Sequence, residues 1–438
     1  MLKVTKFGGS SMADARQLRK VANIIRSDPE RRIVVVSAPG KRHKRDHKVT
    51  DLLYLCHAHV QYGVECDPVF ERITERFLSI RDDLGLALPL EEEFADLKQR
   101  LDAGAVTQDE LVSRGEYFSA RLMAALLGFQ FVDAVDWIRF RLDGSVDQAA
   151  SYEALRAIVS DGGAVIPGFY GRMPDGRIRT FSRGGSDITG ALAAAALDAD
   201  VYENWTDVSG ILMADPRIVD DPQAIPEVTY DELRELSYSG AQVLHEGTIF
   251  PVREKNIPLN IRNTNDPDDP GTMIRERFDG DAAPERFITG ITGKKDFTVI
   301  SLSKRGISNQ VGVFRRLLSI LEAHDISVDY APNGIDNISV VMPTEAIAPC
   351  LYAVLGEIQQ QLQPDSLDVH DQVAIVAAVG RKMKGRPGIS GKIFAALGQA
   401  GINIRMINQS PDELNIVFGV ENRDFANAIR VLYDSFAK

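Results

Sequence analysis

The sequence lacks most features of secreted, metal-binding and membrane proteins. It has 438 residues and three cysteines, which are scattered without CxxC spacing, and this argues against a disulfide framework or a zinc site. Its seven histidines show no metal-ligand spacing such as HxxxH, and His43, His57 and His59 are interpreted as solvated or packing residues. No apolar run approaches the roughly 18–20 residues that cross a bilayer, and Met1–Phe7 has the pattern of a strand, not of a signal peptide. We therefore expect a cytoplasmic protein with no metal centre and no membrane partner.

The chain also has fewer basic than acidic residues. Because 50 lysines and arginines face 62 aspartates and glutamates, the formal net charge is −12. This balance argues against a nucleic-acid partner. The length predicts about two to four domains, and the composition is that of an ordinary globular chain. The sequence therefore predicts a multidomain protein, most simply an enzyme.

Short β-branched runs alternate with helical patterns over the first two-thirds of the chain. Asp14 is placed to cap one helix, and the residues from Thr107 to Glu110 form a capping box for a longer helix that runs toward Leu127. The alternation predicts a largely parallel α/β sheet flanked by helices. Strands are expected at Lys3–Phe7, Ile33–Val36, Ala164–Phe169 and Val201–Trp205.

Turn and linker residues between 263 and 286 are followed by an internal repeat. The offset that carries Gly312 onto Gly388 also carries Leu321 onto Leu397. Both copies show the pattern strand, helix, strand, strand, helix. This predicts two α+β modules of the ferredoxin-like βαββαβ kind in tandem.

The second copy of the repeat ends with a helix at 425–435, so its last strand is missing. Ile288–Thr292, just ahead of the first copy, is an unassigned strand that can supply it. We therefore expect the two modules to interleave. The expected domains are residues 1–285, 286–371 and 372–438, with the strand at 288–292 donated to the second module.

The segment from Lys6 to Ser11, Lys-Phe-Gly-Gly-Ser-Ser, lies where the first strand ends, which is the ligand edge of an open α/β sheet. Glycines let backbone N–H groups approach phosphate oxygens, and a lysine supplies a point charge. A Gly-Gly pair after a strand is a tight turn about as often as a phosphate cradle, so both interpretations stay open. The chain has no GxxxxGK[ST] motif and no clear GxGxxG motif.

The segment from Ser182 to Asp187, Ser-Arg-Gly-Gly-Ser-Asp, gives a stronger signal. It combines a glycine turn, a helix N-terminus and an arginine that can bind a carboxylate through two hydrogen bonds. The structural alternative is a simple helix cap beside a solvated arginine. We favour a ligand-binding role for this segment.

Two further features allow a structural and a functional interpretation. Glu116 lies in an otherwise apolar helix, so it is either salt-bridged or waiting for the ammonium group of a ligand. The segment from Trp205 to Arg217 either forms a loop with internal turns or contacts a nucleotide. The nucleotide contacts would then be Thr206, Asp207 and Arg217.

Taken in order, these segments resemble the aspartate kinase family. The resemblance rests on KFGGSS, the Arg114-Gly115-Glu116 helix, FSRGGSD, WTDVSGI with ADPR, and GAQVLH, ahead of the tandem modules, and it covers essentially the whole chain. It implies an amino-acid-kinase fold followed by two ACT domains. It also implies ATP-dependent phosphorylation of the side-chain carboxylate of L-aspartate to 4-phospho-L-aspartate, the first step toward lysine, threonine and methionine. Because that carboxylate is already ionised at neutral pH, no general base is required.

The resemblance also implies roles for individual residues. Lys6 and Asp187 are expected to be catalytic, with Lys6 on the transferring phosphoryl group and Asp187 orienting it. Glu116 is expected at the ammonium of aspartate and Arg183 at a carboxylate. Magnesium is expected to be carried by the nucleotide. The full expected aspartate set is Thr50, Glu116, Arg183, Gly184, Gly185 and Ser186, and the full expected ATP set is Lys6, Phe7, Gly8, Gly9, Thr206, Asp207, Arg217, Gln242 and Val243.

Three positions depart from the family pattern. Arg114 stands where the family has histidine, Leu212 stands where an aromatic nucleotide contact is common, and Gln242 stands where a lysine is usual. The loss of a cation near the phosphates predicts reduced but real activity. Arg217 or a lysine of the basic run Lys41–Lys48 is expected to compensate.

The tandem modules imply feedback control by an amino acid and a homodimer that pairs through the ACT domains. Lysine is the first expected effector and threonine the second. Asp329 is expected to bind the effector ammonium. The full expected effector set is Asn309, Gln310, Ser327, Val328 and Asp329.

Two other functions stay open at this point. Another kinase of the same fold would phosphorylate glutamate, acetylglutamate or a nucleotide monophosphate, although the tandem modules argue against it. A catalytically degenerate kinase domain would instead act as an ACT-type amino-acid sensor. Gln242 and Leu212 favour the sensor, whereas the intact Lys6 and Asp187 oppose it.

Overall fold

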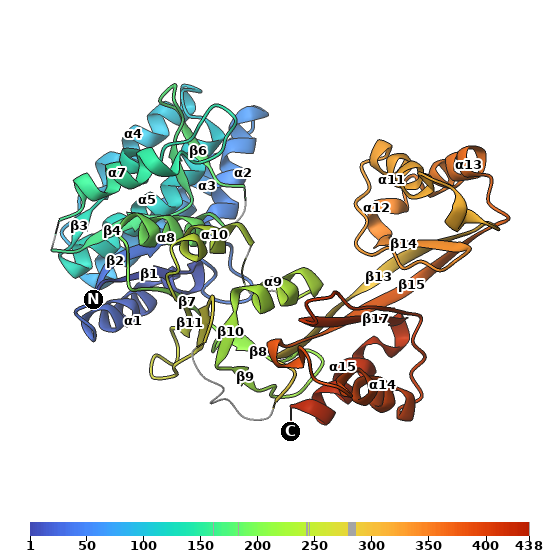
Figure 1. Ribbon diagram of the computed structural model, residues 1–438. Coiled ribbons are helices and arrows are strands. Elements are labelled where there is room, and N and C mark those ends of the chain that lie inside the picture. The colour runs from blue at the N-terminus through green and yellow to red at the C-terminus, as the bar shows by residue number, and fades with distance from the viewer. Residues whose placement is uncertain (161, 183, 242–243, 245, 279–285, 438) are drawn as a thin grey trace. The chain divides into compact units, whose positions relative to one another are not determined.

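The computed structural model describes residues 1–160, 162–182, 184–241, 244, 246–278 and 286–437, and the chain divides into two compact units (Figure 1). The first unit comprises Met1–Ile211, Pro226–Tyr230 and Val243–Phe278. The second unit comprises Leu212–Ile225, Asp231–Gln242 and Asp279–Lys438. Each unit is built around a large sheet of its own.

The first unit contains an eight-stranded sheet with the order β10-β12-β11-β7-β1-β2-β4-β3. Among the strands that the structure describes here, β11 and β12 pair antiparallel and the other neighbours pair parallel. The predicted largely parallel sheet is therefore confirmed. The strands are β1 (Lys3–Phe7), β2 (Arg31–Val36), β3 (Gln130–Phe131), β4 (Ala164–Pro167), β7 (Val201–Thr206), β10 (Glu227–Thr229), β11 (Leu259–Asn263) and β12 (Thr272–Arg275). Short strands outside this sheet are β5 (Tyr170–Arg172), β6 (Ile178–Thr180), β8 (Ile211–Leu212) and β9 (Ala224–Ile225).

Helices cover both faces of this sheet. Successive side chains of a strand point to opposite faces, so each strand contributes to the packing on both sides. Phe7 and Val36 point into an apolar core shared with α1, α3 and α5. Lys6 points to the opposite face, where the alanine-rich α8 crosses β1, β2 and β7. The helices are α1 (Ala15–Arg26), α2 (Val49–Gln61), α3 (Asp67–Leu84), α4 (Leu90–Asp102), α5 (Gln108–Leu127), α6 (Ala134–Trp137), α7 (Gln148–Ile158), α8 (Gly185–Ala196) and α10 (Glu246–Glu254), with a 3₁₀ turn η1 (Gly9–Met12).

The helix starts predicted from local sequence are present. The Asp14 carboxylate accepts a hydrogen bond from the Gln17 N–H at 2.9 Å, at the start of α1. The Thr107 hydroxyl accepts one from the Glu110 N–H at 3.2 Å, at the start of α5. The Glu110 side chain does not close a capping box, because it pairs with Arg100 instead.

The strand expected at 164–169 is shorter than predicted. It ends at Pro167, and Phe169 adopts a left-handed conformation with φ of 82°. The chain turns here because the first turn of α8 lies against it. A Cβ on Gly168 would come within 2.6 Å of the Ser186 Cβ, and a Cβ on Gly185 would come within 2.5 Å of the Phe169 ring.

The second unit is built on a five-stranded antiparallel sheet with the order β14-β13-β15-β17-β16. Helices α11 and α13 share one apolar core with β13 and β14. The strands are β13 (Gly290–Ser303), β14 (Asn337–Pro343), β15 (Ser366–Val379), β16 (Met406–Asn408) and β17 (Asn415–Glu421). The helices are α9 (Tyr230–Ser239), α11 (Val313–Ala323), α12 (Thr344–Ile347), α13 (Leu351–Leu362), α14 (Ile389–Gln399) and α15 (Phe425–Phe436), with 3₁₀ turns η2 (Ile307–Asn309), η3 (Arg381–Met383) and η4 (Asn422–Asp424).

Two long strands, β13 and β15, run side by side through both copies of the repeat (Figure 1). Ile291 pairs with Ala378 in the half of β15 that opens the second copy. Ser303 pairs with Ser366 in the half of β15 that closes the first copy. The segment ahead of the first copy therefore lies beside the second copy, although it is continuous with the first strand of the first copy.

The two copies match in their helices and differ in one strand. Gly312 and Gly388 occupy equivalent positions before α11 and α14, with φ of 80° and 89°. The second copy has the short strand β16, whereas the first copy has at the equivalent place an irregular segment with an isolated bridge between Tyr330 and Val341. Pro332 follows and cannot donate a backbone hydrogen bond, which limits pairing with β14.

Helix α9 is anchored to the second unit although it precedes the linker in sequence. The Glu232 side chain is fully buried. It accepts hydrogen bonds from the Thr289 hydroxyl at 2.6 Å and from the Arg381 N–H at 2.8 Å, and it forms an ion pair with the Arg381 guanidinium at 2.8 Å. The compact units therefore do not follow a single cut at residue 285.

Candidate active site

Lys6 lies at the carboxyl end of the central strand β1 and is nearly buried, with 8% of its surface exposed. Its Nζ lies 2.6 Å from the Asp187 carboxylate in the first turn of α8. It also donates to the Asn204 amide oxygen at 3.5 Å, and the Asn204 amide nitrogen donates to Asp187 at 3.0 Å. Three elements, β1, β7 and α8, therefore fix one ammonium group at the edge of the sheet.

The glycine turn after β1 lies against a second loop. The Gly40 N–H donates to the Gly9 carbonyl at 2.8 Å. A Cβ on Gly40 would come within 2.6 Å of the Gly9 backbone, so this contact requires glycine. A Cβ on Gly8 would lie 3.5 Å from the Lys6 Nζ, which places the turn directly beside the ammonium group. Such a glycine turn with an adjacent lysine suits phosphate oxygens.

The segment expected to bind a carboxylate opens α8. Gly184 adopts φ of 59° before the helix, and Ser186 is buried in the first turn, next to Asp187. Arg183 lies outside the described residues. Asp187 lies in the first turn of α8 and pairs with Lys6, so the Lys6 ammonium lies near the N–H groups at the start of this helix. Both the ammonium and the helix N-terminus carry positive charge at this edge of the sheet.

Glu116 on α5 is a buried carboxylate whose charge has no compensation. It is 5% exposed, and within the described ranges its Oε2 has no hydrogen-bond partner. Burial raises its pKa to about 8, and a hydrogen bond from the Ala38 backbone offsets this only in part. A carboxylate in such a position is stabilised when a ligand supplies a cation.

Ala38 links this carboxylate to the glycine turn. A Cβ on Gly115 would come within 2.8 Å of the Ala38 Cβ, and a Cβ on Gly9 would lie 3.0 Å from the Ala38 carbonyl oxygen. The same Cβ on Gly115 would lie 3.8 Å from Val49, the first residue of α2, which Thr50 follows. The structure therefore brings the Lys6 turn, Glu116 and the half-buried Thr50 to one edge of the sheet.

The other expected nucleotide contacts are less closely tied to this edge. Thr206 ends β7, and its hydroxyl donates to the exposed Asp207 at 3.3 Å. Arg217 belongs to the second unit, where it is exposed and paired with Asp215 at 2.6 Å. Gln242 and Val243 lie outside the described residues.

Sequence reasoning missed two groups that position this site. Asn204 joins Lys6 to Asp187, and the available signal was a polar pair, Glu203-Asn204, inside a strand expected to be buried. Asp46 lies within the basic run Lys41–Lys48, where nothing local marks it as a structural residue. It is buried, accepts from Arg42 at 2.8 Å and pairs with Arg76 at 2.7 Å.

The Asp46 contacts hold the basic loop 41–48 beside the glycine turn. Arg76 is 5% exposed and also donates to the Gly40 carbonyl at 3.1 Å. The Arg42 hydrogen bond holds the pKa of Asp46 well below its usual range, although burial opposes this. Ion pairs therefore hold this loop next to the glycine turn, and its lysines are exposed.

The expected effector residues lie in the second unit around the irregular segment before β14. Asn309 and Gln310 are exposed at the end of η2, Ser327 is exposed and Val328 is half-buried. Asp329 is half-buried, and burial raises its pKa, while a hydrogen bond with Tyr238 of α9 and the charge of Lys294 oppose the rise. Asp329 is thus a partly desolvated carboxylate that contacts helix α9.

A search of the described residues for metal ligands finds Cys66, Asp67 and Asp102 close together. The Lys98 ammonium already occupies the space between the two carboxylates, at 2.8 Å from Asp67 and 2.6 Å from Asp102. This arrangement is that of an ion pair. In the same ranges, none of the helices combines the length and the apolar character needed to cross a membrane.

Comparisons with known proteins agree with the motifs. The amino acid kinase family matches residues 1–263, and the ACT domain matches residues 376–436. Aspartokinase 3 of Bacillus subtilis is 36% identical over 450 residues, covering 99% of this chain and 98% of that protein.

Solved structures give the same result over the whole chain. The aspartate kinase of Clostridium acetobutylicum superposes with a TM-score of 0.90 at 46% identity, covering 99% of both chains. Escherichia coli aspartokinase III, in a complex with aspartate and ADP, gives a TM-score of 0.75 at 26% identity over 100% of both chains. Its complex with lysine and aspartate gives 0.76 at 27%, also over 100% of both chains. The resemblance drawn from the motifs and the fold class that it implied are therefore confirmed.

Proposed function

Because this chain belongs to the aspartokinase family, we propose that it transfers the terminal phosphoryl group of ATP to the side-chain carboxylate of L-aspartate under allosteric control by an amino acid. The observation that carries the proposal is a pair of carboxyl groups at one sheet edge, the half-buried Asp187 and the buried Glu116. Asp187 is bound to Lys6, whereas Glu116 lacks a cation. Aspartate supplies an ammonium for Glu116, and ATP supplies phosphates for Lys6.

The Lys6 ammonium stabilises the charge that develops on the transferring phosphoryl group. Asp187 and Asn204 hold that ammonium in place, and Phe7, Gly8 and Gly9 present their backbone to the phosphates. The attacking aspartate carboxylate forms a bond to phosphorus as the bond to the ADP oxygen breaks, and no proton moves. Magnesium fits best as an ion carried by the nucleotide, because Asp187 is already engaged by Lys6 and Asn204.

The aspartate substrate lies between α5 and the start of α8. Glu116 binds its ammonium, which restores the charge of a carboxyl whose pKa is raised by burial. Thr50, Gly184, Gly185 and Ser186 complete the pocket, and Arg183 binds a carboxylate. The wider ATP contacts are Thr206, Asp207, Arg217, Gln242 and Val243. Gln242 in place of the usual lysine lowers turnover without abolishing it.

We infer that the catalytic domain spans residues 1–285 and that the ACT modules span 286–371 and 372–438. Lysine is the proposed effector, supported by the lysine complex of the E. coli enzyme, and threonine is second. Asp329 binds the effector ammonium, with Ser327 and Val328 as its wall and Asn309 and Gln310 facing it. We further infer a homodimer formed through the ACT modules, which sedimentation of the full chain tests.

The test of this function is aspartate-dependent ADP release with Mg-ATP, with glutamate as the control substrate. We expect turnover with aspartate, none with glutamate, and suppression by lysine. Lysine inhibition that persists in Asp329→Ala would remove the effector assignment. ATP binding without turnover would instead favour the sensor, in which the ACT modules are the functional part.

A further inference from the structure

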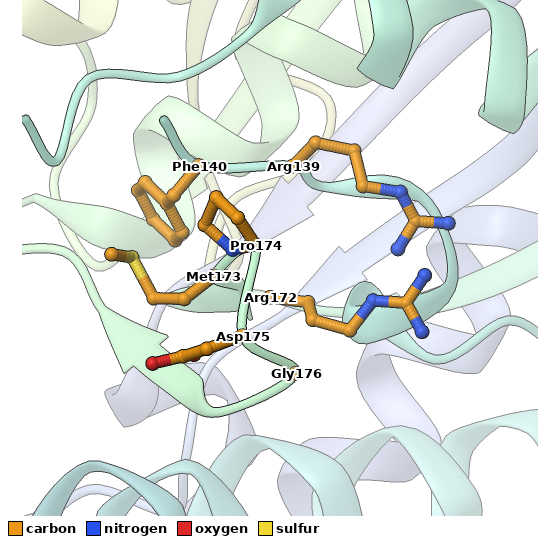
Figure 2. Close-up of a pocket in the computed structure, with 7 residues that line it drawn as sticks. All are labelled: Arg139, Phe140, Arg172, Met173, Pro174, Asp175 and Gly176. Carbon is orange, nitrogen blue, oxygen red and sulfur yellow. The ribbon is translucent and has the colours of Figure 1, made fainter. Parts of the chain in front are cut away.

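The first unit carries a second site candidate away from the Lys6 edge. An open pocket of about 550 Å³ lies between the segment that follows α6 and the β5–β6 hairpin (Figure 2). Arg139 and Arg172 form one wall, and Phe140, Met173 and Pro174 form the other (Figure 2). None of these residues has a role in the kinase reaction proposed above.

The backbone forces the two arginines to face each other. Arg139 and Arg172 are directly opposed in a parallel bridge. Hydrogen bonds on both sides fix this register, because the Arg172 N–H donates to the Ile138 carbonyl and the Phe140 N–H donates to the Arg172 carbonyl, each at 2.9 Å. Figure 2 shows the two guanidinium groups extending to the same side. Like charges placed directly opposite each other on neighbouring strands destabilise the pairing.

Arg172 is exposed at the pocket and Arg139 is half-buried. Over the ranges described by the structure, no carboxylate forms an ion pair with Arg139 or Arg172. The Arg139 guanidinium donates to the Val135 and Asp136 carbonyls, both at 2.7 Å, which holds it rigidly at the pocket. Burial and the neighbouring Arg172 lower the pKa of Arg139, and the nearby Asp136 carboxylate opposes this in part. Asp175 on the rim points away from the arginines and is engaged by Arg177 at 2.6 Å (Figure 2).

A third arginine adds to the excess of positive charge. Arg179 on β6 lies over the Phe140 ring at 5.8 Å and donates to the Met173 sulfur at 3.9 Å. Its contacts are thus with the apolar wall of the pocket. Two guanidinium groups therefore line the pocket and a third lies beside its apolar wall, and this excess of positive charge favours an anion as the ligand.

We propose that this pocket binds a small molecule that carries a phosphate group. One guanidinium fork already satisfies a carboxylate. A phosphate has enough oxygens and charge for the fork of Arg172 and for the N–H groups of Arg139 that do not donate to the Val135 and Asp136 carbonyls. The pocket volume is that of a small-molecule site and exceeds the needs of inorganic phosphate alone. The organic part of the ligand lies against Phe140, Met173 and Pro174.

The pocket lies behind the loop proposed to bind substrate. The Phe140 ring packs on Phe181 with ring centroids 5.1 Å apart, and Phe181 precedes Ser182. Activity measurements would therefore mix effects on this pocket with effects on the kinase site. The test must report binding and stability directly, in the absence of ATP and aspartate.

The first experiment titrates the full-length protein with inorganic phosphate and with glycerol 3-phosphate by calorimetry at constant ionic strength. We expect Arg172→Gln to weaken binding at least tenfold. Arg141→Gln is the matched control, because Arg141 follows Phe140, is exposed and pairs with Asp147 at 3.7 Å. Phosphate binding that is equal in the parent and Arg172→Gln belongs to the Lys6 turn and would overturn the proposal. Malonate binding as tight as phosphate binding would overturn the choice of phosphate.

The second experiment follows thermal unfolding of the same proteins. Without an anion, Arg172→Gln should be at least as stable as the parent, because it removes a repulsion. Arg172→Glu should be more stable, because it places a carboxylate opposite Arg139. Phosphate should raise the unfolding temperature of the parent more than that of either variant. A loss of stability in both variants, with an unchanged response to phosphate, would show that the arginines serve the fold alone.

Discussion

The fold treats the half-buried Asp187 and the buried Glu116 of the kinase site in opposite ways. On the side of β1 and α8, Asp187 is held by an ammonium at 2.6 Å and an amide at 3.0 Å. On the side of α5, the Oε2 of Glu116 has no partner in the described part of the chain. Asp187 has its hydrogen-bond and ion-pair partners before ligands bind, whereas Glu116 gains a partner for its Oε2 only when a ligand supplies an ammonium group.

This difference separates transfer from recognition. A preorganised ammonium stabilises the transferring phosphoryl group without reorganising at the moment of reaction. Burial keeps the Glu116 carboxyl protonated in the empty site, and a cationic ligand stabilises its charged form, so the site favours a ligand of one charge type. Changes on the Lys6 side should therefore appear mainly in kcat, and changes on the Glu116 side should appear mainly in the KM for aspartate.

The largest effect is expected from Lys6→Met. Removal of the ammonium should lower kcat by roughly 10²–10³-fold, because one preorganised charge-stabilising group is lost. The measurement is ADP release at saturating aspartate and ATP. Lys3→Met is the matched control on the same strand, since Lys3 pairs at the surface with Asp28 at 2.6 Å. A kcat for Lys6→Met within a few-fold of the parent would contradict the role of Lys6.

Glu116→Gln comes next. Loss of a charge-assisted hydrogen bond to the substrate ammonium should raise the KM for aspartate roughly 10- to 100-fold, with a smaller change in kcat. Initial rates over a range of aspartate concentrations measure this. Glu110→Gln, on the same helix and paired with Arg100, serves as the control. An unchanged KM would show that Glu116 serves only the packing of α5.

The pH dependence of the KM for aspartate tests the role of Glu116 in a second way. The pKa of Glu116 is about 8, so below that pH the carboxyl must lose a proton when the substrate ammonium binds. The KM for aspartate should fall as pH rises, by roughly tenfold per pH unit at most. Glu116→Gln should remove this dependence. A slope that persists in the variant would assign the titration to another group.

Asn204→Ala tests the completeness of the Lys6 side. It leaves the ion pair in place and removes one hydrogen bond to each partner, so kcat should fall about fivefold, as expected for about 1 kcal/mol. Asn260→Ala is the control, because Asn260 is a buried polar residue on the adjacent strand, next to Glu203, and points to the other face. Equal losses in both variants would indicate a general effect on the sheet.

The last prediction concerns stability rather than activity. The folded state raises the pKa of Glu116 from its ordinary 4.5 to about 8, so between these values the folded protein holds a proton that the unfolded chain releases. The contribution of Glu116 to stability is therefore present below 4.5 and lost as pH rises toward 8. Urea unfolding should show Glu116→Gln gaining stability relative to the parent across this range. A constant difference would place the pKa of Glu116 near its ordinary value.

Local sequence patterns predicted the elements well and the strand ends less well. The caps at Asp14 and Thr107 and the repeat marked by Gly312 and Gly388 are present as expected. The strand at 164–169 stops at Pro167, because the first turn of α8, which is distant in sequence, lies against Gly168. Tertiary contact overrode strand propensity at that point.

The candidate site was found in part. Lys6, Gly8, Gly9 and Asp187 follow from glycine turns and charges next to strand ends, and the structure places them together. Their roles stay predictions until the kinetic tests are made. The contribution of Asn204 could not be predicted, because its partners lie on β1 and α8 and nothing local marks them.

By itself, the sequence determined the parallel α/β unit, the tandem modules and the family, because periodicity, caps, glycine turns and repeats act over short stretches of chain. Only the tertiary structure decided which charges meet. Asp46 finds Arg76 on α3, Asp187 finds Lys6 on β1, and Arg139 faces Arg172 across two segments. These contacts join residues that are far apart in the chain. Their energies depend on how deeply the charges are buried, and a local sequence pattern does not predict that burial.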